Sequence, residues 1–267
     1  MAQTVLIPGC VAAFKDDVAH AVEKQGYEAR FMGNIVESDI DMGQSYIDND
    51  VCVAAIGTIG QCVRYLRNKP EYTKVLVPEV CKDCRACSLA ALLPDALHRA
   101  GIDNIEIVPM SCAELSSCIG AKSAEVPESD KPVIGVCGNA VVLSTPLFNR
   151  TVVEHLSKSG CEVVMPPLNI LVNEQDFLVP CIEWFASQGI KSVICILAFG
   201  CLGGHAYARG KARVLRERFS DVELTLLDYD PSASDINVVN RTELVIQSAK
   251  DRSGDTRAVG AGSKRSF

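Results

Sequence analysis

The chain has 267 residues, of which 48% are hydrophobic and 22% are charged, so it has the composition of an ordinary globular protein with room for one large domain or two of about 100–150 residues. The net charge of −7, together with the lack of a basic stripe in the sequence, argues against a nucleic-acid-binding protein. No run approaches the ~20 apolar residues of a membrane span, which argues against a membrane protein.

Thirteen cysteines are a high number for a chain of this length. The first four residues lack the charged and apolar regions of a signal peptide, so we expect a cytoplasmic protein whose thiols stay reduced. Four cysteines lie within or beside apolar runs, where free cysteine behaves as a small buried apolar residue. These are Cys137, Cys161, Cys181 and Cys195.

The first half of the chain alternates between strand-like and helix-like runs. Strands are expected at 4–8, 27–32, 74–80 and 104–109, and helices at 14–24, 39–48, 53–66, 88–100 and 113–119. Gly57 and Gly60 leave one face of the expected helix 53–66 without side chains, which predicts that another element packs closely against it there. Such alternation predicts a parallel sheet with helices on both faces.

A polar stretch at 120–131 is expected to be a linker, and the alternation resumes after it. Strands are expected at 132–136, 161–165, 192–199 and 223–227, and helices at 146–158, 176–188, 205–219 and 236–250, with a loop at 138–145. We therefore predict an α/β protein with an N-terminal domain at 1–122, a C-terminal domain at 131–250 and a disordered tail at 251–267. The two halves look like copies of one architecture, without a sequence repeat.

Three cysteines at a spacing of three, Cys81, Cys84 and Cys87, follow the expected strand 74–80. Open α/β sheets bind ligands at the carboxyl ends of their strands. A CxxCxxC pattern is a recurring way to offer thiolates to an iron–sulfur cluster, but it also suits zinc, a Cys81–Cys84 dithiol switch, or inert thiols. Arg85 is either a contact for an anionic partner or an ordinary solvated arginine.

Two further cysteines occupy similar places in the pattern. Cys52 comes just before a helical run, and Cys201 just after the strand 192–199. Gly200, Gly203 and Gly204 remove side chains around Cys201, and the helix that follows directs unpaired N–H groups towards this loop. Such a loop suits a thiolate or a cluster sulfide, whereas the alternative is a tight strand-to-helix turn with an incidental cysteine.

Taken together, these loops resemble those of the 2-hydroxyacyl-CoA dehydratase / benzoyl-CoA reductase subunit superfamily. The resemblance is closest to the dehydratase-like segments of CoA-substrate-specific enzyme activases and to double-cubane cluster proteins, and it covers nearly everything from Thr4 to about Lys250. The matching stretches are Asn49-Asp50-Val51-Cys52 with Ile59-Gly60-Gln61, Cys84-Arg85-Ala86, Val163-Val164-Met165-Pro166-Pro167, Phe199-Gly200-Cys201-Leu202-Gly203-Gly204 and Leu227-Asp228-Tyr229-Asp230 with Asn240-Arg241.

The resemblance implies two flavodoxin- or Rossmann-like domains with a cleft between them. In that cleft it implies a [4Fe-4S] or double-cubane [8Fe-9S] cluster held by Cys52, Cys84 and Cys201, with Cys81 and Cys87 as auxiliary thiols. It also implies low-potential electron transfer or reductive radical chemistry on an acyl-CoA thioester or another small substrate. The implied partner is an ATP-hydrolysing activator protein or a second dehydratase-like subunit.

The sequence departs from the family pattern around all three of these cysteines, and after Cys201-Leu202 the family's proline is replaced by Gly203. Val53-Ala54 replaces the tyrosine-proline that often follows the first cysteine, and Cys81-Lys82-Asp83 replaces a glycine-rich stretch. No GxxxxGK[ST] loop for ATP is present, and whether the chain is itself an enzyme stays open. Two other functions remain open: a non-catalytic or regulatory interaction module with zinc or no metal, and a thiol redox switch without iron.

Overall fold

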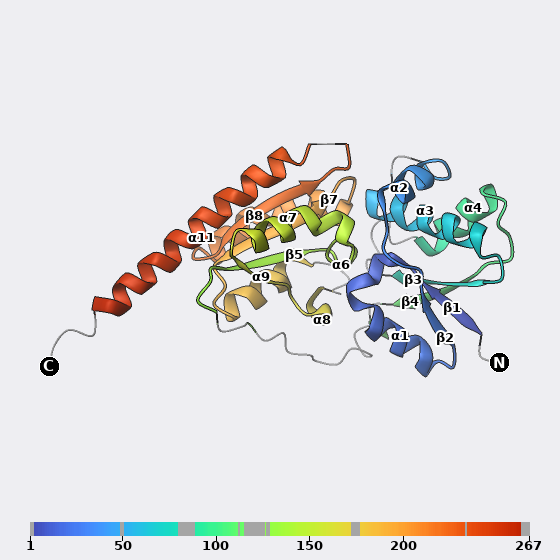
Figure 1. Ribbon diagram of the computed structural model, residues 1–267, viewed down its shortest axis with the longest axis horizontal. Helices are drawn as coiled ribbons and strands as arrows, with labels where there is room; N and C mark the ends of the chain where they lie inside the picture. Colours follow the sequence, from blue (N-terminus) through green and yellow to red (C-terminus); the bar gives the residue numbers. More distant parts are fainter. Residues whose placement is uncertain are drawn as a thin grey trace.

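The computed structural model describes residues 3–48, 51–79, 89–111, 113–114, 126, 129–171, 177–232 and 234–262. These residues form two four-stranded sheets in which every neighbouring pair of strands is parallel, and helices cover both faces of each sheet (Figure 1). The predicted α/β class, with two parallel-sheet domains, is confirmed. The boundaries at 122 and 131 stay predictions, because most of the chain between 112 and 128 lies outside the described residues.

The N-terminal sheet has the order β2-β1-β3-β4. Its strands are β1 (Thr4–Ile7), β2 (Glu28–Phe31), β3 (Lys74–Glu79) and β4 (Glu106–Ser111). Its helices are the 3₁₀ segment η1 (Gly9–Phe14), α1 (Lys15–Lys24), α2 (Glu37–Gln44), α3 (Val53–Asn68) and α4 (Leu89–Arg99). Helix α1 covers one face of the sheet, and α3 and α4 cover the other (Figure 1).

The C-terminal sheet repeats this order as β6-β5-β7-β8. Its strands are β5 (Val133–Gly138), β6 (Glu162–Val164), β7 (Ser192–Ala198) and β8 (Glu223–Tyr229). Its helices are α6 (Ala140–Ser144), α7 (Pro146–Lys158), α8 (Leu168–Leu171), α9 (Leu178–Ser187), the π-helical turn η3 (Gly203–Ala208), α10 (Arg209–Arg218) and α11 (Ile236–Gly262). The two halves are therefore one architecture used twice, as the sequence pattern predicts.

Close packing at the glycines of α3 is confirmed. A side chain at Gly60 would place its Cβ 1.7 Å from the carbonyl oxygen of Asp39, so α2 lies directly against α3. Asp39 is completely buried, and its carboxylate accepts hydrogen bonds from Arg64 and from the backbone N–H of Val36. These contacts hold α3 firmly, and α3 begins immediately after Cys52.

Two segments differ from their prediction. The expected loop 138–145 contains the short helix α6, because the side chain of Asn139 caps it: Asn139 Oδ1 accepts a hydrogen bond from the N–H of Val142 at 2.8 Å. The expected disordered tail is helical as far as Gly262. Arg252 binds Ser192 Oγ at 2.7 Å and Glu223 at 2.5 Å, and no proline interrupts the turns that follow, so each further residue adds one helical hydrogen bond.

The two domains share one continuous buried core. Helix α6 of the C-terminal domain packs against η1 of the N-terminal domain, and Ser144 Oγ donates a hydrogen bond to the carbonyl oxygen of Cys10. Phe148 of α7 lies beside Gly57 of α3, and its ring centre is 5.1 Å from that of Tyr229. None of the helices in the described part of the chain combines the length and apolar character that crossing a bilayer requires.

Candidate functional site at the domain interface

The carboxyl ends of strands from both sheets lie at the interface between the domains. Strand β1 leads into η1, which contacts α6 at the end of β5. Strand β7 leads into Phe199, whose carbonyl oxygen accepts a hydrogen bond from the N–H of Val53 at 3.3 Å. Because ligands of parallel α/β sheets bind at these carboxyl ends, this interface is the candidate site.

Cys52 lies at the N-terminal domain's side of this interface. It is the N-cap residue of α3, with an extended backbone (φ −65°, ψ 150°), and its carbonyl oxygen accepts the first helical hydrogen bond, from the N–H of Ile56 at 3.1 Å. Its side chain is only 4% exposed. The thiol is therefore held on a rigid helix start and shielded from water.

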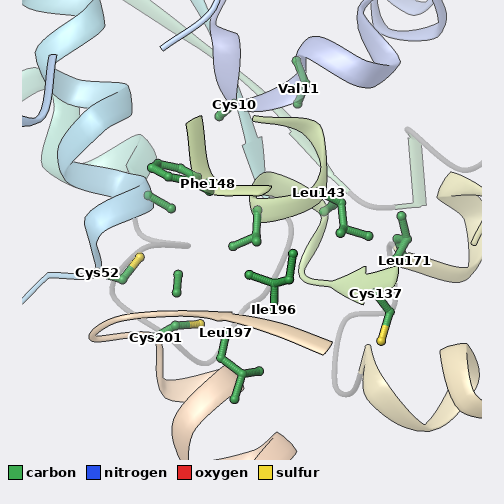
Figure 2. Close-up of a cluster of buried hydrophobic side chains, with 14 of the residues drawn as sticks. Cys10, Val11, Cys52, Cys137, Leu143, Phe148, Leu171, Ile196, Leu197 and Cys201 are labelled. Carbon is green, nitrogen blue, oxygen red and sulfur yellow. The ribbon is translucent and has the colours of Figure 1, made fainter. Parts of the chain in front are cut away.

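Cys201 lies at the C-terminal domain's side, in the loop after β7. Gly200 adopts a left-handed conformation (φ +74°), and a Cβ there would lie 3.2 Å from the Cα of Cys52. The N–H of Cys201 closes the turn on the carbonyl oxygen of Ala198 at 3.1 Å. The tight turn thus brings the backbone of one cysteine loop into contact with the other (Figure 2).

Two donors among the described residues hydrogen-bond to the sulfur of Cys201. One is the backbone N–H of Gly204 at 3.3 Å, which belongs to η3, and the other is the Nδ2 group of Asn139 at 3.6 Å. The residue is buried, with 6% of its surface exposed. N–H groups directed at a buried sulfur stabilise negative charge on it, as a thiolate or a metal-bound thiolate requires.

The three cysteines of the CxxCxxC stretch, Cys81, Cys84 and Cys87, and Arg85 between them, lie outside the described residues. This stretch follows the end of β3, which lies between β1 and β4 in the sheet. No side chains of the described residues form a group of three metal ligands. Of the predicted ligands, the structure thus places Cys52 and Cys201 next to each other, and the role of all five stays a prediction.

The other described cysteines lie in the core. Cys137, Cys181 and Cys195 are completely buried and Cys161 is 5% exposed, which confirms the predicted burial of all four. Burial raises the pKa of the Cys10 thiol to about 12 and also raises the pKa of Cys62. Burial and contacts among neighbouring thiols raise the pKa of Cys137 and of Cys195 well above its usual value. These thiols are protonated at neutral pH.

A cavity of about 440 Å³ opens between the domains. It is lined by residues 34–38, which precede and begin α2, and by Pro146 and Leu147 at the start of α7. Three large side chains around the Cys201 loop, those of Phe199, Leu202 and Tyr207, are 54%, 44% and 43% exposed. The interface therefore has an open cavity, and large apolar side chains are exposed on the segment that carries Cys201.

Sequence reasoning missed Asn139. The available signal was local: an asparagine directly before a short apolar run is a preferred N-cap of a helix. Its contact with Cys201 depends on how β5 and β7 pair, with Gly138 opposite Ile196, and this register is a property of the folded sheet.

Comparison with known proteins does not assign the chain to a family. The chain matches no protein-family model, and no curated protein is significantly similar to it.

Proposed function

We propose that this chain is an iron–sulfur protein of the 2-hydroxyacyl-CoA dehydratase type, with its cluster between the two domains. The observation that carries the proposal is the meeting of Cys52 and Cys201: two buried thiols from different domains lie on adjoining loops at the carboxyl edge of the sheets. A structural role in the core does not require cysteine at either place, whereas cluster ligation requires thiolates from converging loops.

The two interface cysteines, Cys52 and Cys201, supply thiol donors of the kind that such a group requires. Cys52 and Cys201 would hold it together with Cys84, and Cys81 and Cys87 would serve as auxiliary thiols. A bound cluster would supply one-electron chemistry at low potential. The chain's own residues would exclude water from the sulfurs, and the N–H of Gly204 and the start of η3 would stabilise their negative charge.

Two features of the interface region support the partner and substrate parts of the proposal. We assign the exposed side chains of Phe199, Leu202 and Tyr207, which lie close together in the sequence, to docking of an ATP-hydrolysing activator protein or a second dehydratase-like subunit. We assign the cavity lined by 34–38, Pro146 and Leu147 to a small thioester or related substrate. The proposed location is the cytoplasm, where thiols stay reduced.

The experiment is a measurement of iron and acid-labile sulfide per chain after purification without oxygen. About four irons with matching sulfide would support one [4Fe-4S] cluster, and about eight would support a double cubane. No iron, even after anaerobic reconstitution, would contradict the proposal. Zinc without iron would instead favour the interaction module, and a reversible Cys81–Cys84 disulfide without metal would favour the redox switch.

A further inference from the structure

Asn139 is positioned by the pairing of β5 with β7. Gly138 lies opposite Ile196 in the sheet, and a Cβ at Gly138 would lie 2.7 Å from the carbonyl oxygen of Ile196. The glycine therefore allows the two strands to approach closely at their carboxyl ends. The next residue, Asn139, is thereby brought beside the loop that carries Cys201.

The orientation of the Asn139 amide follows from its second contact. Its Oδ1 accepts a hydrogen bond from the N–H of Val142 at 2.8 Å and so caps α6. With the oxygen committed to the cap, the Nδ2 group faces the sulfur of Cys201, at 3.6 Å. Asn139 is half-buried, so its side chain is partly shielded from water.

We propose that Asn139 is a positioning residue that raises the reduction potential of the cluster, an inference that rests on the proposed function. A reduced cluster carries one more negative charge than an oxidised one, and that charge is shared with the ligand sulfurs. A hydrogen bond to the Cys201 sulfur therefore stabilises the reduced state more than the oxidised state. The N–H of Gly204 acts on the same sulfur from the backbone, whereas the amide of Asn139 is a side-chain donor that substitution can remove.

The test compares variants that keep the helix cap but change the donor. Asn139→Asp and Asn139→Ser both retain an oxygen that can accept from Val142, whereas neither offers an amide N–H to the sulfur. Asn149→Ala is the matched control, because Asn149 holds α6 through the carbonyl oxygens of Val142 and Leu143 without contacting Cys201. The readout is the midpoint potential, from a titration followed by electron paramagnetic resonance.

We expect a negative shift of the midpoint potential in both Asn139 variants, larger for aspartate because it adds a negative charge, and no shift in Asn149→Ala. If Asn139→Asp does not retain iron, the midpoint potential is compared between Asn139→Ser and wild type alone. Equal potentials in Asn139→Ser and wild type, with iron content intact, would overturn the inference and leave the proposed function standing.

A second readout does not depend on the cluster. In the metal-free protein we expect the side-chain amide resonances of Asn139 to shift in Cys201→Ala, because their acceptor is lost, and to stay unchanged in Cys181→Ala. Unchanged resonances in Cys201→Ala would overturn the inference even if iron binds. Wild-type protein without iron would overturn both this inference and the proposed function.

Discussion

Cysteines gather in two regions of this molecule, and their surroundings differ. Inside the C-terminal domain, Cys137 and Cys195 are opposite one another in β5 and β7, and Cys181 of α9 lies beside Cys137. All three are completely buried. At the domain interface, Cys52 and Cys201 are buried almost as deeply, but they lie on loops at the ends of secondary-structure elements rather than within a sheet.

The difference shows that burial alone does not make a ligand site. The sulfurs in the sheet have other thiols as hydrogen-bonding neighbours, and their pKa values are raised, so they are held in the protonated form. The Cys201 sulfur instead accepts N–H donors from Gly204 and Asn139. Donors of this kind stabilise a negative sulfur, which is the form that binds metal.

The largest expected effect separates these two groups directly. Cys52→Ser and Cys201→Ser are each expected to lose most of the bound iron, because each removes a proposed thiolate ligand. Cys181→Ala, a substitution in the buried group, is expected to retain it, at a cost of about 1–2 kcal/mol in unfolding free energy for the small cavity. Iron per folded chain is the measurement, and equal loss in all three variants would contradict the distinction.

A smaller effect is expected from a substitution in the turn at Gly200, which brings the two cysteine loops into contact. Gly200→Ala places a side chain in a left-handed conformation and within 3.2 Å of the Cα of Cys52. Gly189→Ala is the matched control, since Gly189 has φ +73° but no atom within 4 Å of the added Cβ.

Gly189→Ala measures only the cost of placing an alanine in a left-handed conformation, which is about 1 kcal/mol of unfolding free energy. We expect Gly200→Ala to cost up to about 1 kcal/mol more, because the two loops must separate. Urea unfolding of the metal-free proteins gives both values. Identical unfolding free energies for the two variants would mean that the contact between the loops contributes nothing to stability.

The smallest effect concerns the pH dependence of stability. The pKa of Cys10 is about 12 in the folded protein and 9.0 for an ordinary thiol. Between pH 9 and pH 12 the Cys10 thiol is deprotonated in the unfolded chain but still protonated in the folded chain. Its contribution to the unfolding free energy is therefore complete below pH 9 and decreases as the pH rises towards 12.

Cys10→Ala removes this contribution. From pH 8 to pH 10 the wild type is therefore expected to lose about 1 kcal/mol more unfolding free energy than Cys10→Ala. Urea titrations under reducing conditions at the two pH values provide the comparison. Parallel losses in both proteins would show that the Cys10 thiol is not kept protonated by burial.

The sheets were predictable because their strands are short apolar runs that alternate with amphipathic helices, a pattern that dictates parallel pairing. The closeness of Cys52 and Cys201 was suggested by the resemblance and by the position of their loops beside expected strands and helices. Whether Cys84 joins them stays a prediction, since its stretch lies outside the described residues.

Other features could not be predicted because they arise from tertiary contacts. Helix α6 has five residues, too few for a helical period to be recognised, and its cap is made by one side chain. Helix α11 continues beyond residue 250 past Arg252, whose partners Ser192 and Glu223 lie on different strands. The contact between Asn139 and Cys201 requires the register of β5 with β7.

The most direct test of the central claim is to locate the iron. Anomalous scattering should be recorded at the iron absorption edge from crystals of anaerobically purified protein. We predict an iron site between the domains, bonded to the sulfurs of both Cys52 and Cys201 at about 2.3 Å, the usual metal–thiolate length. Iron bound elsewhere, with these two sulfurs unligated, would contradict it.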